Sequence, residues 1–600
     1  MADLISIICL FGFYKIGLNI SAYYYKSKTN ILQNIFSFTL VFYLIYIITS
    51  YFFIFQINSG FISAGIAILS FVLGISFLLK KYKIILKKIN NNFNHKLLLL
   101  SIFSYFLLSY LVPSDQDSIR YHLEIPKNII ENTFYKNSTF DYMMIGANEF
   151  IILFGLHLNF ENTASLLSFT YIIFIILTNN FFLEKYKIGS KYLGGIIIIS
   201  SPYLVSLIAS QKIYLLPCFI VSYSIAYLYI AKNKIVFKDV LLIIVLNIFS
   251  VCLKTIFLPY LLYILFWSLF IFKSTRIEKI YISLFSFFVG CLSYLPIGWI
   301  KYQLYKDPFI PIISLNPDNQ EWLKMWYYYL TNFQMDFTDR FNTFFQIILI
   351  PVKLIVPLSP TDLFRTLGIG MAGLLLLPYK KNKNLLLIIF FFLISFFILG
   401  NYQSRWLLPL LIFIGIFVQE IGNNFFKKIV YLQLICILFV VTPLGLFSFV
   451  GSYISKINIE KKIIPIKHIS QKINEKYKNQ KYFTNSNFFY YHDNKIPIYY
   501  PEITQIFDKD LFNRNKNVRL FLHIDSGKFD ISQYVKGGQF QFPKYIWSDS
   551  AKEKYTKKNS KEITATCANS GYQIVETWRF NVRRFFLFPA MQSLTLYRLC

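Results

Sequence analysis

The strongest constraint on this chain is a series of apolar runs, each of roughly 16–25 residues, about the length needed to cross a bilayer. Only helices or closed barrels can span the hydrocarbon region, because every backbone polar group must be paired internally. The runs are continuous rather than alternating in polarity, so they predict helices, about fourteen in number. The predicted spans are 2–20, 32–56, 60–79, 97–112, 163–183, 193–209, 213–231, 240–253, 256–272, 280–300, 366–379, 385–399, 406–421 and 428–449.

The composition agrees with a membrane protein and argues against a nucleic-acid-binding one. Charged residues make up 15% of the 600 residues and hydrophobic residues 56%, whereas a soluble domain usually has about 25% charged residues. The formal charge of +30 suggests a polyanionic partner. However, much of the excess lysine lies between apolar runs, where the positive-inside rule predicts it. We therefore expect no nucleic-acid partner.

The lysines also predict which connections face the cytoplasm. The segment 80–96 carries six lysines and must lie inside, which fixes the direction of every span. The other basic connections then also fall inside, and the apolar run 343–358 becomes a helix at the outer surface. These inner connections are 26–28, 185–191, 232–238, 273–279, 380–383 and 427–428. The longest segments left outside are 113–147, 301–365 and everything after 450. Long ordered loops often carry function, so we expect the chemistry outside.

The last 150 residues contain no run long enough to span. They predict a non-cytoplasmic soluble domain over 451–600, a small α/β or α+β fold with strands near 518–524 and 582–588 and a basic helix near 467–480. The predicted fold class is thus an all-α polytopic membrane protein with an extramembrane C-terminal domain. The polytopic membrane domain covers 1–450. Its expected location is the bacterial plasma membrane.

The first outer loop, 113–147, begins with a dense cluster of polar side chains at the membrane edge. Carboxylates in that position are costly unless they are hydrated or engaged. A helix over 117–131 would place Asp117, Tyr121 and Glu124 on one face. The cluster consists of Asp115, Asp117, Arg120, Tyr121, His122, Glu124 and Lys127.

This loop resembles the first outer loop of GT-C-fold glycosyltransferases of the protein-mannosyltransferase and aminoarabinose-transferase type. The shared pattern is Asp-x-x-x-Tyr, here Asp117 to Tyr121, followed by Pro126-Lys127. In that family the Asp is the catalytic carboxylate. Weaker similarities follow in the same order along the chain, at 148–155, Lys254-Thr255, 305–311 and 403–409. The resemblance implies a GT-C-like fold and sugar transfer from a lipid-phosphate donor.

Two features depart from the family pattern. Three or four spans precede the loop, whereas the simplest members have one. Where those members carry an Asp near the outer end of a later span, this chain has Lys212. No metal ligands are assigned, and a divalent metal cofactor stays open, because His122 beside Asp117 lacks a second histidine.

The chemistry of such a donor assigns provisional roles. Its leaving group is already a phosphate, which needs positive charge rather than a strong acid, while the acceptor needs a base. Asp117 is the expected base and Asp115 its alternative. Lys254 and Arg405, both at outer ends of spans, are the expected phosphate contacts. The secondary substrate-binding candidates are Arg120, Tyr121, His122, Lys127 and Glu149.

Structural roles compete with each of these assignments. Asp115 and Asp117 could simply begin a helix, and Glu149 could cap one. Arg405 could be an interfacial anchor whose guanidinium reaches the headgroups. Lys254 interrupts two apolar runs, so it could mark a hairpin turn.

The sequence favours an inverting membrane glycosyltransferase that moves a sugar from a polyprenyl phosphate to an acceptor glycan, lipid or protein. The alternatives are a polysaccharide polymerase or ligase and a transporter of lipid-linked sugars. A polymerase or ligase would use Arg and His in a late outer loop, but 301–365 lacks His. A transporter would carry more charges in mid-span. A non-enzymatic scaffold is a third alternative.

Overall fold

The structure of the chain is a computed structural model. The chain divides into two compact units. The helical unit comprises residues 1–111 and 125–446, and the second unit comprises 112–124 and 447–600. Within 2–454 the structure describes all residues except 27–28, 58, 86–92, 112–117, 136–139, 191, 232–234, 311–349, 357–365, 380–383, 399–403 and 420–423. After 454 it describes 469, 472–473, 475–476, 482–484, 497–499, 520–525, 572–584 and 588–599.

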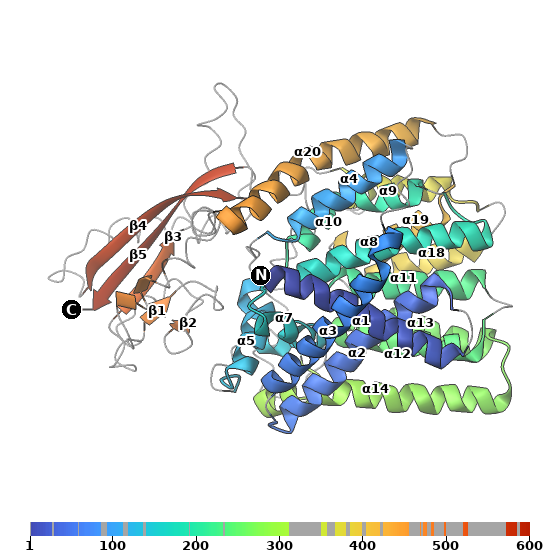
Figure 1. Cartoon of the computed structure of the whole chain (residues 1–600), viewed down its shortest axis with the longest axis horizontal. Coiled ribbons are helices and arrows are strands. Elements are labelled where there is room, and N and C mark those ends of the chain that lie inside the picture. The colour runs from blue at the N-terminus through green and yellow to red at the C-terminus, as the bar shows by residue number, and fades with distance from the viewer. Residues whose placement is uncertain are drawn as a thin grey trace. The chain divides into compact units, whose positions relative to one another are not determined.

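The described part of the first 454 residues is almost entirely helical (Figure 1). Long helices alternate with short α, 3₁₀ and π turns. The longer helices are α1 (Ala2–Tyr25), α2 (Ile31–Ile54), α3 (Ser59–Ile85), α4 (Phe93–Leu108), α8 (Thr163–Tyr186), α11 (Leu215–Ile230), α12 (Phe237–Leu253), α14 (Arg276–Tyr305), α18 (Asn384–Ile398) and α20 (Asn424–Ile454). The shorter elements are η1 (Ser118–His122), α5 (Glu124–Ile130), η2 (Phe140–Met144), α6 (Ala147–Ile151), α7 (Leu153–His157), α9 (Leu193–Ile199), α10 (Pro202–Ile208), η3 (Thr255–Phe257), α13 (Leu258–Phe266), η4 (Trp267–Ile271), α17 (Ile350–Ile355), η7 (Ile369–Leu376), η8 (Ser404–Leu407) and α19 (Leu408–Phe417).

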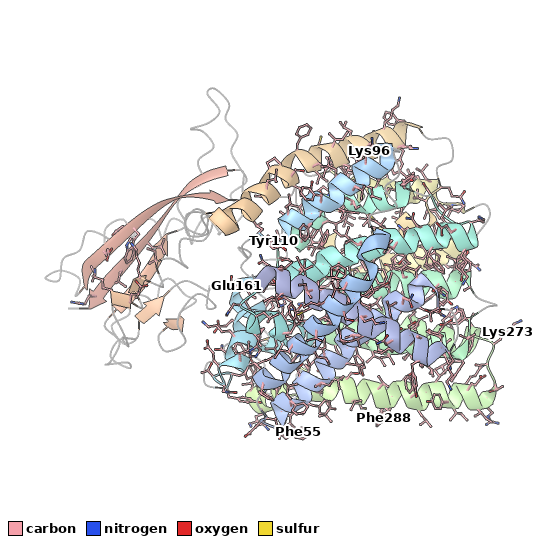
Figure 2. The ribbon with its side chains drawn as sticks, viewed as in Figure 1. Phe55, Lys96, Tyr110, Glu161, Lys273 and Phe288 are labelled. Atoms are coloured by element: carbon pink, nitrogen blue, oxygen red, sulfur yellow. The ribbon has the colours of Figure 1, made fainter. Side chains whose placement is uncertain are left out.

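Several helices have the length and the apolar surface of membrane spans. Among the described residues, six are long and apolar enough to cross, and six more apolar helices are shorter. The helix α14 shows the lipid-facing character, since Ile277, Phe287 and Phe288 are each more than 60% exposed. Figure 2 labels Phe288 on this helix. Large exposed apolar surfaces are rare on soluble monomers. Together with the long apolar helices, they indicate that the chain is a helical membrane protein.

Glycines allow α1 and α3 to pack backbone against backbone. A Cβ atom built on Gly12 would lie 1.7 Å from the carbonyl oxygen of Ser70, and one on Gly74 would lie 2.0 Å from that of Ile8. Any larger side chain at either position would force the helices apart. Close approach through small residues is typical of membrane helices, where there is little hydrophobic drive for helices to associate.

Among the predicted spans that differ from the observed elements, 193–209 and 366–379 are the clearest examples. The run 193–209 is divided into α9 and α10 by a break at Ser200 and Ser201, after which Pro202 opens the new helix. Proline is suited to a first helical turn but not to a helix interior. The run 366–379 contains the eight-residue 3₁₀ helix η7 rather than an α-helix. At about 2 Å per residue, η7 rises only about half the hydrocarbon thickness.

The second unit contains a five-stranded mixed sheet in the order β2-β1-β3-β5-β4. Strands β1, β2 and β3 pair in parallel, whereas β5 pairs antiparallel with both β3 and β4. The bounds are β1 Tyr482–Thr484, β2 Pro497–Tyr499, β3 Leu520–Asp525, β4 Tyr572–Arg584 and β5 Phe588–Leu599. The strand predicted near 518–524 corresponds to β3, but 582–588 joins the end of β4 to the start of β5. Independent folding of 451–600 stays a prediction.

Candidate functional site

One end of the helical unit is tied together by a buried carboxylate. Asp239 accepts hydrogen bonds from the hydroxyls of Tyr25 (2.6 Å) and Tyr227 (2.9 Å) and from the amide of Gln33 (3.1 Å). Asp239 lies in the first turn of α12, where a helix stabilises negative charge. It therefore joins the ends of α1, α2, α11 and α12 that carry the predicted inner connections.

Figure 2 shows the two ends of the helical unit by their labelled residues. Lys96 and Lys273, both from predicted inner connections, lie toward one side. Tyr110 and Glu161 lie toward the opposite side. Two basic connections thus share one end, as the positive-inside rule requires, while the direction of the unit across the membrane stays a prediction.

The opposite end of α12 meets the segment that contains Glu149. A Cβ atom on Gly146 would lie 2.9 Å from the carbonyl oxygen of Cys252, so this glycine touches the last turn of α12. The Glu149 carboxylate accepts from the Gly146 backbone amide at 2.7 Å and from the Asn148 side chain at 3.1 Å. Glu149 is 1% exposed and caps α6. Capping, one of its two predicted roles, is therefore present, and contact with substrate stays a prediction.

Lys254 and Arg405 are brought to this same end from separate parts of the chain. Lys254 is an extended, partly exposed residue between α12 and η3, as expected of a turn. Arg405 lies in η8, with its guanidinium carbon 4.8 Å from the ring centroid of Trp406. Tyr214 connects the two elements, because its ring lies 5.4 Å from that of Trp406 and 5.9 Å from that of Phe257 in η3.

Asn148 joins Glu149 to the same group of residues. Its side-chain oxygen accepts from the backbone amide of Ile213 at 3.0 Å, directly before Tyr214. The adjoining Lys212 is partly exposed. Thus the start of α6, the start of α11, the end of α12 and the start of α19 all meet here. We call this region, defined by Glu149, Tyr214, Lys254 and Arg405, the cationic end of the helical unit.

A further buried cation lies in the last turns of α14. Lys301 is 3% exposed and donates to the carbonyl oxygen of Ile310 at 2.7 Å. It interacts electrostatically with Glu149 and with Asp307, which is fully buried. A buried ammonium is costly unless anions and acceptors surround it. The electrostatic interaction with Glu149 also places Lys301 at the cationic end.

The candidates of the first outer loop are only partly described. Asp115 and Asp117 lie outside the described residues, and so does the side chain of Arg120. The helix expected over 117–131 is instead the π turn η1 followed by α5. Pro126 explains the separation, because it is tolerated in the first turn of α5 but not in mid-helix.

Tyr121, His122 and Glu124 are buried, with exposures of 8%, 0% and 5%, and Lys127 is partly exposed. The first three belong to the second unit, whereas Lys127 belongs to the helical unit. Their predicted contacts with a substrate stay predictions.

Comparison with family models, with curated proteins and with solved structures found no match. The assignment of a function therefore rests on the residues themselves. No group of three or more His, Cys, Asp or Glu suited to a metal occurs among the described residues.

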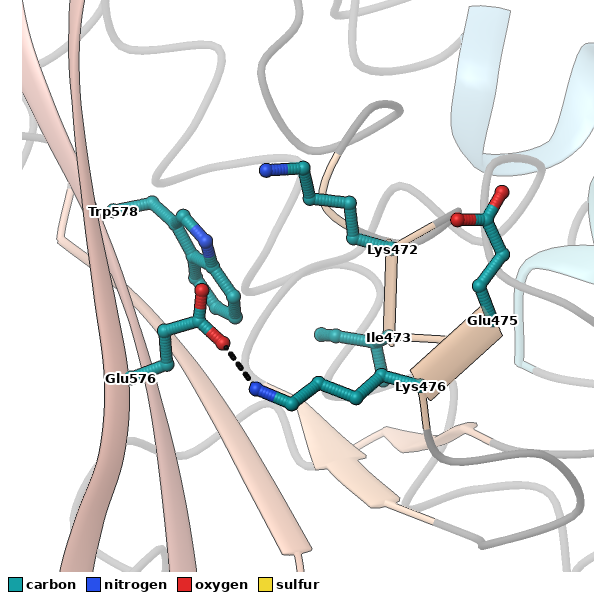
Figure 3. Close-up of a pocket in the computed structure, with 6 residues that line it drawn as sticks. All are labelled: Lys472, Ile473, Glu475, Lys476, Glu576 and Trp578. Carbon is teal, nitrogen blue, oxygen red and sulfur yellow. Dashed lines mark hydrogen bonds and ion pairs between the residues drawn. The ribbon is translucent and has the colours of Figure 1, made fainter.

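The second unit has a shallow pocket of about 360 Å³ between a basic helical segment and strand β4 (Figure 3). Residues 469, 472–473 and 475–476 are helical, as predicted for 467–480. The Lys476 ammonium lies 3.0 Å from a Glu576 carboxylate oxygen, and both groups are substantially exposed. The pocket's charges balance, and such surface pairs contribute little. Its lining residues are Lys472, Ile473, Glu475, Lys476, Glu576 and Trp578.

Sequence reasoning missed Lys301, Tyr214 and Trp406. Lys301 lies near the end of an apolar run, where a lysine usually reaches the headgroups. Tyr214 and Trp406 belong to a sequence with 20% aromatic residues, so neither stands out. The one signal that could have found them is their position, because each directly borders a predicted phosphate contact or a predicted span end.

Proposed function

We propose that this chain is a membrane glycosyltransferase that transfers a sugar from a polyprenyl phosphate to an acceptor, with the donor phosphate held at the cationic end of the helical unit. The observation that supports this most is that Tyr214 packs against both Phe257 and Trp406, in the short helices η3 and η8 beside or containing Lys254 and Arg405. Residues about 150 positions apart in sequence come together beside a buried carboxylate, Glu149. Cations at a membrane edge are stable when they meet an anion or reach the headgroups.

The reaction requires one displacement at the sugar. The acceptor hydroxyl attacks C1 of the sugar, and Asp117 takes up its proton, with Asp115 as the alternative base. The bond between C1 and the phosphate oxygen breaks as the new C1–O bond forms, which inverts the configuration. The prenyl phosphate leaves with the bonding electrons. Lys254 and Arg405 stabilise the charge that develops on it.

The two cations would contact the phosphate in different ways. Arg offers a phosphate two parallel hydrogen bonds, whereas Lys supplies a compact charge. Together they hold the phosphate before and after the sugar departs. The resemblance of 117–127 to the first outer loop of GT-C enzymes supports the assignment of the base.

Transfer of a radiolabelled sugar from a prenyl-phosphate donor by the purified chain tests the proposal. Asp117→Asn keeps the shape of the side chain and removes the base, so transfer should fall by about a hundredfold or more. Glu131→Gln, an acid-to-amide change at an exposed position of the same loop, is the matched control and should transfer normally. Undiminished transfer in Asp115→Asn, Asp117→Asn and the double variant would reject the carboxylate mechanism.

The assay also separates the competing functions. A chain that moves the intact lipid-linked sugar across vesicles, with no new glycosidic bond, would be a transporter. A product that carries several sugars on the donor lipid would identify a polymerase.

A further inference from the structure

The side-chain hydroxyl of Tyr214 is buried without a hydrogen-bond partner among the described residues. Tyr214 is 1% exposed and precedes α11. A buried hydroxyl without a partner destabilises the folded protein, because it has lost its hydrogen bonds to water. Most buried tyrosines of this unit avoid that cost; the hydroxyl of Tyr223, on the same helix, donates to the carbonyl oxygen of Ile175 at 3.0 Å.

The indole N–H of Trp406 likewise has no hydrogen-bond acceptor among the described residues. This N–H is buried, although a buried indole N–H usually finds an acceptor. The ring of Trp406 lies against that of Tyr214, with centroids 5.4 Å apart and planes inclined by 57°. Two of the unsatisfied donors among the described residues therefore lie in one contact pair.

Arg405 completes the chemistry of the pair. Its guanidinium lies over the Trp406 ring and interacts electrostatically with the Tyr214 hydroxyl. An indole and a guanidinium can only donate hydrogen bonds. The cluster thus offers positive charge and several donors but few acceptors. The group that complements it is an anion with several oxygen atoms.

We infer that Tyr214 and Trp406 donate hydrogen bonds to the phosphate group that Arg405 attracts, and that they form the neutral half of a phosphate-binding site. The inference rests on the proposed function only in naming a prenyl lipid as the source of that phosphate. Neutral donors add directional bonds to the phosphate without further positive charge to desolvate. In a membrane such a site selects a lipid by its headgroup.

The consequence for stability is unusual and makes the inference testable. In the ligand-free protein the Tyr214 hydroxyl bonds to nothing in the described part of the chain, so Tyr214→Phe should leave the unfolding temperature unchanged or raise it. The same variant should weaken binding of a prenyl monophosphate at least tenfold. Tyr223→Phe is the matched control: it removes a satisfied hydroxyl from the same helix, so it should lower the unfolding temperature and leave binding unchanged.

The measurement is ligand-induced thermal stabilisation of the full chain in nanodiscs. The probes are a prenyl monophosphate, the matching prenyl alcohol and inorganic phosphate. Stabilisation by the prenyl monophosphate alone supports a lipid headgroup as ligand. Stabilisation by inorganic phosphate as well supports the phosphate site with a free source. Trp406→Phe provides a second variant, with the same expected loss of binding.

Three results would overturn the inference. The first is wild-type affinity for prenyl monophosphate in both Tyr214→Phe and Trp406→Phe. The second is equal stabilisation by the prenyl alcohol, because the phosphate would then contribute nothing. The third is a lower unfolding temperature for ligand-free Tyr214→Phe, which would reveal a protein partner for the hydroxyl. If the chain binds prenyl monophosphate through Tyr214 but transfers no sugar, the inference stands and the proposed function fails.

Discussion

Lys301 donates a hydrogen bond of 2.7 Å to the carbonyl oxygen of Ile310, nine residues further along the chain. The bond closes the turn that follows α14 around a buried ammonium. Because Glu149 and Asp307 also act on this ammonium, one side chain joins the end of α14 to the start of α6.

Replacing Lys301 should therefore destabilise the helical unit. Lys301→Met removes a cation that interacts with two buried carboxylates, and the loss of one partner from a buried charge group costs about 3–5 kcal/mol. Lys306→Met, at an exposed position in the same turn, should change the unfolding temperature little. The thermal unfolding of both variants in the same lipid checks the expectation. Equal unfolding temperatures would mean that the buried charges do not depend on Lys301.

The carboxylate at the other end of α12 predicts a graded loss of stability. Asp239→Leu leaves Tyr25, Tyr227 and Gln33 without their shared acceptor, at a cost of at least about 2 kcal/mol. Asp239→Asn keeps one acceptor oxygen and should lose less. Denaturant unfolding of the two variants gives the comparison. A larger loss in the Asn variant than in the Leu variant would contradict the hydrogen-bonding account.

Arg405→Lys distinguishes a phosphate contact from an interfacial anchor. The variant keeps the charge and the reach to the headgroups but loses the planar fork. If Arg405 contacts the phosphate, sugar transfer by Arg405→Lys should fall at least tenfold, equivalent to about 1.4 kcal/mol in the barrier. Transfer kinetics with a prenyl-phosphate donor provide the measurement. Wild-type rates in both Arg405→Lys and Lys254→Ala would leave the donor site unassigned.

The direction of the chain across the membrane can be tested by cysteine labelling. In a background without the seven native cysteines, Lys88→Cys should be shielded from an impermeant maleimide in intact cells, whereas Lys136→Cys should react. The reason is the concentration of lysine in 80–96 on the predicted inner side. The opposite labelling pattern would invert the topology and place the cationic end in the cytoplasm.

Much of the helical architecture could be predicted because a membrane span needs a long apolar run and little else. The predicted span 163–183 corresponds to α8, and 280–300 lies within α14. The same criterion failed at 193–209 and 366–379, where an apolar run covers a broken helix or a 3₁₀ helix. Hydropathy responds to composition, whereas a break depends on side chains elsewhere. At Ser200 the carbonyl oxygen accepts from Gln433, 233 residues away.

The candidate site was predictable only in part for a similar reason. Counting spans placed Lys254 and Arg405 on one side, and the structure brings both to the cationic end. Counting spans could not show that Tyr214 packs against Phe257 and Trp406, because ring packing depends on how the helices are arranged in three dimensions. The burial of Lys301 could not be predicted either, since the sequence does not show whether a lysine near a span end is buried or exposed.

The hydrogen bonds of Asp239 have a consequence for how the helical unit can move. Four helix ends are fastened there to one carboxylate or adjoin it, whereas the cationic end is built largely from short elements such as α6, η3 and η8. A 3₁₀ stretch that interrupts a helical run often marks a hinge. We expect the Asp239 end of the helical unit to be rigid. Any movement that admits a lipid headgroup should then be concentrated among the short elements of the cationic end.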